Sequence, residues 1–479
     1  MKNIITILIT FLCLGAVAQP PQRFFTTFGG NGIDIGYSAK QTLDRQYIIT
    51  GSTSSYGAGN TDVYLVKLDS MGQILWQKTF GGFANDVGKS VIQVPDSGYI
   101  VAGFTSSFGA GGYDAYILRT DKAGTLIWQK TFGGTDWDFA NDLIYSPDGD
   151  IMVVGNTSSF GNGKKDGFVI KYDFLGNLVF QKYFGGIEDD ELRSIIRTND
   201  LNIATVGYTK SKGDINGDCY FLKLNLNGDT LFTRKDGGPY NDYWSDLVQM
   251  NNGNYILVGA KTFTANTPTH SYKREYNSNG VFLVDAENYN SSSDENWVSI
   301  IDSYAGANFF VTIRTVPVPA LNIEGNIFLH KNDFTYPALV NSFCGSEDEY
   351  VYSVDKTKDG GYVCVGYSNS FGSLNGDVFL IKQDSTIITY SNVVSIKENK
   401  NLDLNSILKN LNNNYYEIEM STSNSFNIKL VDIFGKIIME RKIEDNKTTL
   451  SLNELNSGLY ILNVSTNNTN TKSYKLIKN

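Results

Sequence analysis

The sequence repeats at an interval of 52 residues, and this repeat constrains the fold more than any other feature. An aromatic–Gly–Gly triplet starts at Phe28, and again at Phe80, Phe132 and Phe184, each 52 residues after the one before. Repeats of this length pack against their neighbours and share one continuous core. The length of 479 residues therefore does not by itself predict several independent domains.

Each repeat contains four segments with strand character, separated by Gly, Asp and Ser. In the second copy they span residues 88–94, 99–105, 115–121 and 125–132, where β-branched and aromatic residues dominate. Four short strands per unit are typical of a β-propeller blade. More divergent copies open at Asp236, near Tyr289 and at Phe343. We therefore predict an all-β fold with a seven-bladed propeller over residues 19–388.

The two ends of the repeat region complement each other. The seventh copy stops after its third strand, near Asp384, and lacks the Gly-x-x-x-Trp-Gln-Lys segment that ends the other copies. Phe24 lies four residues before Phe28, just as Trp76 lies before Phe80. We expect residues 22–28 to form the missing fourth strand of the last blade. This would close the ring and remove two exposed strand edges.

Residues 1–18 have the pattern of a secretory signal peptide, with Lys2, a short apolar run and Ala-Val-Ala before Gln19. A membrane anchor is the alternative, but the run is too short to span a bilayer comfortably. A lipoprotein is not expected, because Cys13 follows Phe-Leu and not small residues. The net charge of −10 argues against nucleic acid or an anionic membrane surface as partner. The remaining cysteines do not suggest a disulfide framework; they are Cys219, Cys344 and Cys364.

A carboxylate occurs six positions after the opening residue of every repeat, at Asp34, Asp86, Asp138, Asp190, Asp242, Glu295 and Glu349. A second column precedes the third strand, at Asp62, Asp114, Asp166, Asp218 and Asp377. We expect both columns on the same face of the propeller. We interpret them as structural, because a group present in every blade is best explained by a turn that every blade has. The alternative is an acidic mouth that binds a cation or a basic partner.

Ligand-binding candidates come from blades five and six, which depart most from the repeat, and from aromatic residues at the starts of inner strands. They are the aromatic residues Trp137, Tyr240, Trp244 and Trp297, together with His270. Such side chains could stack on sugars or contact a protein, and packing between blades is the alternative. Asp214, Asn216 and Asp218 resemble the start of a calcium loop, with a plain turn as the alternative. Calcium is the only cofactor considered, and no catalytic residue is predicted.

The composition changes after Asp384, which predicts a linker at residues 389–401 and a small β-sandwich at residues 402–479. The Gly435-Lys436 turn, the Gly458-Leu-Tyr460 strand and the basic end at Lys478 resemble a type A C-terminal sorting domain of type IX secretion. The segment at 405–409 departs from the family's usual Tyr-Pro-Asn-Pro-like start. The resemblance implies the type IX secretion machinery as partner and export to the surface of a Gram-negative bacterium. An immunoglobulin-like adhesion sandwich is the alternative.

The second strand of the repeat, Ile100-Val-Ala-Gly-Phe-Thr105, resembles the repeats of secreted bacterial β-propellers. This resemblance implies a scaffold and not an activity. We therefore predict a secreted or surface binding protein that recognises a glycan or a protein. The alternatives are a polysaccharide-active enzyme and a structural surface component without a ligand. An enzyme should carry unmatched acids or histidine in a deep pocket of one or two blades, whereas a binding scaffold keeps equivalent residues in every blade.

Overall fold

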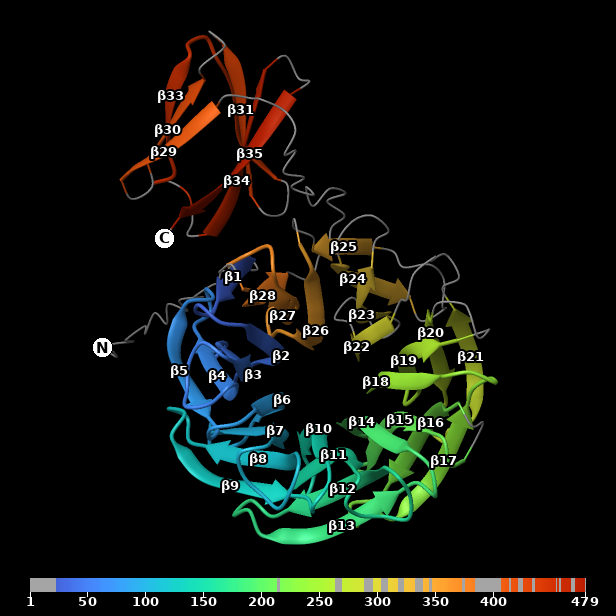
Figure 1. The fold of residues 1–479 in the computed structure, drawn as a ribbon. Coiled ribbons are helices and arrows are strands. Elements are labelled where there is room, and N and C mark those ends of the chain that lie inside the picture. Colours follow the sequence, from blue (N-terminus) through green and yellow to red (C-terminus); the bar gives the residue numbers. More distant parts are fainter. Residues whose placement is uncertain are drawn as a thin grey trace, which may run out of the picture.

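The chain forms an all-β ring followed by a small β domain (Figure 1). The computed structural model describes residues 23–212, 216–262, 269–287, 296–302, 309–317, 323–331, 339–343, 347–372, 375–383, 406–412, 415–420, 425–432, 436–453, 455, 458–466 and 470–478. Within these ranges every regular element is a strand. No helix there has the length and apolar content needed to cross a bilayer. The predicted all-β propeller is confirmed.

Each blade is a four-stranded antiparallel sheet whose first strand lies innermost (Figure 1). Blade one contains β2 (Asp34–Gln41), β3 (Tyr47–Thr53), β4 (Asp62–Leu68) and β5 (Ile74–Phe80). Blade two contains β6 (Asp86–Gln93), β7 (Tyr99–Thr105), β8 (Asp114–Thr120) and β9 (Leu126–Phe132). Blade three contains β10 (Asp138–Tyr145), β11 (Ile151–Thr157), β12 (Asp166–Tyr172) and β13 (Leu178–Phe184). Blade four contains β14 (Asp190–Arg197), β15 (Ile203–Thr209), β16 (Asp218–Leu224) and β17 (Thr230–Asp236). Blade five contains β18 (Tyr243–Gln249), β19 (Tyr255–Lys261), β20 (His270–Tyr276) and β21 (Phe282–Glu287). Blade six contains β22 (Asn296–Asp302), β23 (Phe309–Pro317), β24 (Ile323–Lys331) and β25 (Leu339–Phe343).

The last blade joins the two ends of the ring. Its sheet has the order β1-β28-β27-β26, made from β26 (Glu349–Lys356), β27 (Tyr362–Ser368), β28 (Asp377–Gln383) and the N-terminal β1 (Phe24–Phe28). The register runs from Phe24 opposite Lys382 to Phe28 opposite Val378. The predicted closure by the N-terminal strand is confirmed, and it gives β28 a hydrogen-bonded neighbour on each side.

Packing between blades explains the strand sequences. The middle strands, such as β3 and β4, are buried along their whole length because a neighbouring blade covers each face of the sheet. The outer strands, such as β5, contain only exposed and half-buried residues. Trp76 on β5 packs against Gly124 in the next blade, where φ is +77° and a Cβ would lie 2.9 Å from the indole. A positive φ and this close contact both require glycine, which explains why glycine recurs at this position of the repeat.

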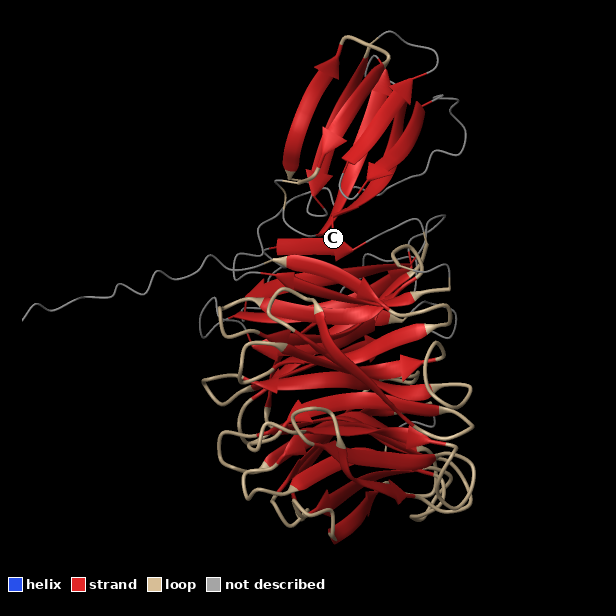
Figure 2. Ribbon diagram, turned by 90° about the vertical axis from the view of Figure 1, so that its left-hand side faces the viewer, coloured by secondary structure: helices blue, strands red, loops and turns tan. Residues whose placement is uncertain are grey.

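The loops of the ring lie on two faces, seen edge-on in Figure 2. One face carries the connections between blades and the loops between second and third strands, because an antiparallel blade brings these ends together. Thr61 in one such loop bridges Asn85 in the following connection. We call this the double-glycine face, after the Gly–Gly pairs of the connections. The hairpins between first and second strands and between third and fourth strands lie on the opposite face.

The C-terminal domain has two sheets, with orders β29-β30-β33 and β32-β31-β34-β35. Its core includes Ile418, Leu430 and Leu462, which are buried. The strands are β29 (Ser406–Asn412), β30 (Tyr415–Met420), β31 (Phe426–Asp432), β32 (Ile437–Ile443), β33 (Lys447–Ser451), β34 (Gly458–Thr466) and β35 (Asn470–Lys478). The predicted small sandwich is confirmed, although the sequence patterns missed β29 and β30.

Candidate functional site

The first column of acids accepts hydrogen bonds inside the double-glycine turns. Asp86 accepts from the backbone N–H of Gly82 at 2.8 Å and from Ser107 Oγ at 2.6 Å, and Thr105 Oγ1 also donates to it. Asp34, Asp138 and Asp190 each accept from the equivalent glycine N–H and serine hydroxyl. Asp242 and Glu349 are also buried, and Glu295 lies outside the described residues. These carboxylates act as fixed acceptors for the turns around them.

The second column meets the first at the same glycines. Asp62 Oδ2 accepts from the N–H groups of Ala58 and Gly59, at 3.0 and 3.1 Å. A Cβ on Gly81 would lie 2.3 Å from Asp62 and 2.4 Å from Asp86, so only glycine fits between the two carboxylates. Burial raises the pKa of Asp242 to about 6. Both columns therefore lie on the double-glycine face, with their oxygens directed into the protein.

The predicted ligand-binding aromatic residues do not form one site. Trp244 is fully buried and stacks on Tyr272 with ring centroids 5.1 Å apart. Trp297 and His270 are buried as well, so these three side chains do not reach solvent. Tyr240 is half-buried in the connection before β18, whereas Trp137 is 58% exposed in the connection before β10. Only Trp137 presents a large surface to a partner.

The residues of the predicted calcium loop are only partly described. Asp214 lies outside the described residues, while Asn216 donates from Nδ2 to the Pro239 carbonyl at 2.6 Å. Asp218 is buried at the start of β16. Across the described part of the chain, no group of three or more His, Cys, Asp or Glu side chains could hold a metal ion. The calcium hypothesis stays a prediction.

Four apolar side chains project from successive connections on the double-glycine face. Phe83 is 89% exposed and Ile187 is 76% exposed, and both directly follow a Gly–Gly pair. Ile33 is 50% exposed. Ile33 and Trp137 share a second position, directly before the first-column aspartate of their connections. We call Ile33, Phe83, Trp137 and Ile187 the exposed apolar arc. The sequence analysis missed three of its members because loop position alone does not show exposure.

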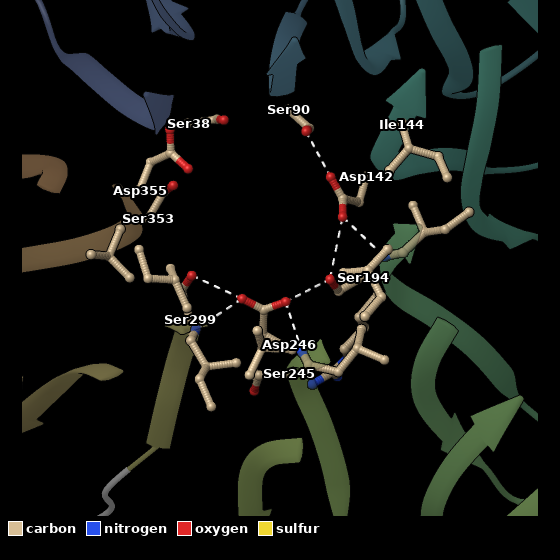
Figure 3. Close-up of a pocket in the computed structure, with 18 of the residues that line it drawn as sticks. Ser38, Ser90, Asp142, Ile144, Ser194, Ser245, Asp246, Ser299, Ser353 and Asp355 are labelled. Carbon is tan, nitrogen blue, oxygen red and sulfur yellow. Dashed lines mark hydrogen bonds between the residues drawn. The ribbon is translucent and has the colours of Figure 1, made fainter. Parts of the chain in front are cut away.

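A cavity of about 440 Å³ runs along the axis of the ring and is lined by the seven innermost strands. Each of these strands has a β-bulge at the same place. Because a bulge sets two consecutive residues against one partner, both side chains can face the channel. The second residue of each bulge belongs to a belt of hydroxyls and carboxylates: Ser38, Ser90, Asp142, Ser194, Asp246, Ser299 and Ser353 (Figure 3).

The two aspartates link the blades through this belt (Figure 3). Asp246 accepts from Ser194 Oγ at 2.6 Å, from Ser299 Oγ at 2.9 Å and from the backbone N–H of Ile300 at 2.9 Å. Asp142 accepts from Ser90 Oγ at 2.7 Å and from the N–H of Ile195 at 3.0 Å. Burial raises the pKa of both carboxyl groups, against the effect of these hydrogen bonds.

The first residues of the bulges form a second tier, nearer the double-glycine face. Lys89 and Arg193 supply two cations here, and Tyr37 and Tyr352 supply aromatic rings 5.0 Å apart. Lys89 Nζ lies 3.8 Å from the centroid of Tyr37, and burial lowers the pKa of this lysine to about 8. On the other side of the belt, Lys40 pairs with Asp355 at 3.2 Å and joins the first blade to the last.

Comparison with known families identifies the C-terminal domain. Residues 410–479 match the family described as "Secretion system C-terminal sorting domain", and residues 43–74 match the "Domain of unknown function (DUF5122) beta-propeller". The chain is therefore a repeat β-propeller with a type IX sorting domain, and this domain directs it to the cell surface or the extracellular space. Of the predicted sorting residues, Gly458 pairs with Lys478 across β34 and β35, Tyr460 is buried, Lys436 is exposed, and Gly435 lies outside the described residues.

Other known proteins are similar over part of their length. The regulatory protein FlaEY of Caulobacter vibrioides is 26% identical over 258 residues, covering 46% of this chain and 26% of FlaEY. PorZ, described as an essential bacterial surface component of the type-IX secretion system of Porphyromonas gingivalis, has a TM-score of 0.41 at 11% identity, covering 94% of this chain and 60% of that one. The polysaccharide lyase Uly1 has a TM-score of 0.44 at 12% identity, with 74% and 90% coverage. Nothing about activity follows from likenesses this weak.

Proposed function

We propose that this chain is an exported binding protein whose double-glycine face recognises an extracellular glycan or protein. The exposed apolar arc is the observation that carries the proposal. Single exposed apolar residues are common, whereas contiguous apolar patches mark interaction sites. The arc presents one apolar side chain in each of four successive connections, and we propose that a partner contacts them together. Phe83 and Trp137 also offer rigid rings, which supply contact area at a low cost in conformational entropy.

The proposal is tested by binding of the mature chain to arrays of glycans and of extracellular proteins. In the variant Phe83→Ser/Trp137→Ser we expect at least about tenfold weaker binding, equivalent to about 1.4 kcal/mol. The matched control is Leu43→Ser/Leu175→Ser, because these residues are 62% and 73% exposed but lie in hairpins of the opposite face. The control should bind like the unaltered chain.

Two results would contradict the proposal. If both double variants lost binding equally, the double-glycine face would not be the recognition surface. If the unaltered chain bound nothing on either array, a structural surface component without a ligand would be the better description.

A polysaccharide-active enzyme is the second candidate, and the channel contains a feature that favours it. Asp142 and Asp246 are unmatched acids in a deep cavity, where the other five blades have serine. However, hydrogen bonds from hydroxyl and backbone donors of the ring already occupy both carboxylates. A general base needs a free oxygen within reach of the substrate. We therefore assign these acids to blade linkage, and hydrolysis of a polysaccharide that is lost in Asp142→Asn would overturn this assignment.

A further inference from the structure

The channel contains a cation that the protein does not neutralise. Lys89 makes no hydrogen bond and no ion pair with the described residues, although its side chain is half-buried and lines the cavity. Its Nζ lies over the face of Tyr37, 3.8 Å from the ring centroid. Burying a charge without a partner is costly, so such groups are usually paired. A half-buried ammonium that lines a cavity and has no ion-pair partner among the described residues points to an anionic ligand.

Arg193 adds a second donor at the same tier of the channel. Its Nε donates to Glu191 at 3.1 Å, while its terminal nitrogens have no hydrogen bond to the described residues. The guanidinium lies over Tyr243, 4.2 Å from the ring centroid, which holds its plane in place. A guanidinium with both terminal nitrogens open can bind a carboxylate with two parallel hydrogen bonds.

The charge around this tier is unusual for the protein as a whole. Glu191 is the one carboxylate paired with Arg193 and Lys165, at 3.1 and 2.9 Å, and it is also the carboxylate that attracts Lys89. Three cations therefore surround one anion, in a chain whose net charge is −10. This local excess of positive charge favours an anion over a cation at the mouth of the channel.

The remaining lining matches a hydroxylated ligand. Ser245 and Ser353 face the cavity, and their hydroxyls have no partner among the described residues (Figure 3). Tyr37 and Tyr352 also line the cavity, with ring centroids 5.0 Å apart. The volume of about 440 Å³ lies within the range of roughly 300–1,000 Å³ typical of small-ligand sites. Sugars offer hydroxyl groups to such serines and apolar ring faces to such aromatic residues.

We propose that Lys89 and Arg193 form a binding site for the carboxylate of an anionic sugar, such as a uronic acid residue in an acidic polysaccharide. This inference rests on the function proposed above and names its ligand class. The carboxylate of the sugar lies toward the double-glycine face, and its hydroxyls lie toward the belt of hydroxyls and carboxylates. The opposite orientation would bring the carboxylate against Asp142 and Asp246.

Titration calorimetry on the mature chain tests the site with tetragalacturonate as the probe. We expect tetragalacturonate to bind, maltotetraose to bind far more weakly because it lacks charge, and Lys89→Gln to weaken tetragalacturonate binding about tenfold, equivalent to about 1.4 kcal/mol. Arg193→Gln should have a similar effect. Lys122→Gln is the matched control, because it removes one positive charge from an exposed turn and should leave the affinity unchanged.

Three results would overturn the proposed carboxylate-binding site. It fails if the unaltered chain does not bind tetragalacturonate, if Lys89→Gln binds it as tightly as Lys122→Gln does, or if tetra-aspartate or sulfate binds equally well. Circular dichroism and melting curves show whether each variant is folded, and Lys89→Met is a second variant that keeps the apolar stem. The arc variant Phe83→Ser/Trp137→Ser separates the two proposals. Array binding that depends on the arc, with no tetragalacturonate binding, would retain the proposed function and reject this site.

Discussion

Replacing Asp246 by alanine should loosen the ring more than any other single change in the channel. The carboxylate accepts hydrogen bonds from Ser194, Ser299 and the N–H of Ile300, so it links three blades. A hydrogen bond to a charged group contributes about 1.5–3 kcal/mol, which gives about 4.5–9 kcal/mol for three. Burial of the carboxylate, which raises its pKa, offsets part of this sum. We expect a net loss of about 3–5 kcal/mol in the free energy of unfolding.

Differential scanning calorimetry of the mature chain at pH 7 measures this loss. At about 2–4 °C per kcal/mol for domains of 150–250 residues, and less for larger ones, Tm should fall by roughly 5–10 °C. Asp246→Ser should cost much less, because five other blades have serine at this position. Asp136→Ala is the control, since that carboxylate is exposed and makes no hydrogen bond with the described residues. A Tm for Asp246→Ala equal to that of the control would refute the linking role of the belt.

Three further predictions concern the rest of the ring. Lys89→Met should be about 2 kcal/mol more stable at pH 7, because lowering the lysine pKa from 10.5 to about 8 costs about 3 kcal/mol and the Tyr37 contact returns about 1. The unfolded chain holds the Lys89 proton more tightly than the folded chain does, so the stability advantage of Lys89→Met should shrink between pH 8 and 10.5. Denaturant titrations measure this, and an advantage that grew over this range would refute the lowered pKa of Lys89. Gly124→Ala should cost more than Gly253→Ala in Tm, because both have positive φ but only Gly124 lies against an indole; equal losses would refute the packing role. Removing residues 23–28 should expose the edge of β28 and cause aggregation on size-exclusion chromatography, and a monodisperse product would argue against closure by β1.

The fold could be predicted from the sequence because several copies of the repeat carry the same strand pattern. Four strand segments at a fixed period predicted the blade, and the complementary ends predicted the closure now seen between Phe24 and Lys382. β29 was missed because Lys409, Asn410 and Asn412 break the alternation of apolar and polar residues, whereas β30 was missed although Tyr416–Met420 alternates. β29 pairs with β30, and β30 also pairs with β33, which is a long-range contact that local pattern does not show.

The site was harder to predict, because it depends on which way side chains point. Trp244 and Trp297 directly precede the bulge pair of their strands, in a column where other blades have Gly36, Gly88 and Ala140. Both indoles are members of buried core clusters and do not face solvent. An alignment of the repeats could have shown that both indoles belong to the column directly before the bulge pair. The channel belt could not be recognised in the same way, because the bulge that turns it inward is a backbone feature without a sequence signature here.

The central claim is that the double-glycine face and its channel mouth recognise a partner. Hydrogen exchange of the mature chain, with and without tetragalacturonate and then with any partner found on the arrays, measures this directly. We expect protection in the connections that carry Phe83 and Trp137 and in the inner strand that carries Lys89. Protection confined to the hairpins around Leu43 and Leu175, or protection nowhere, would contradict it.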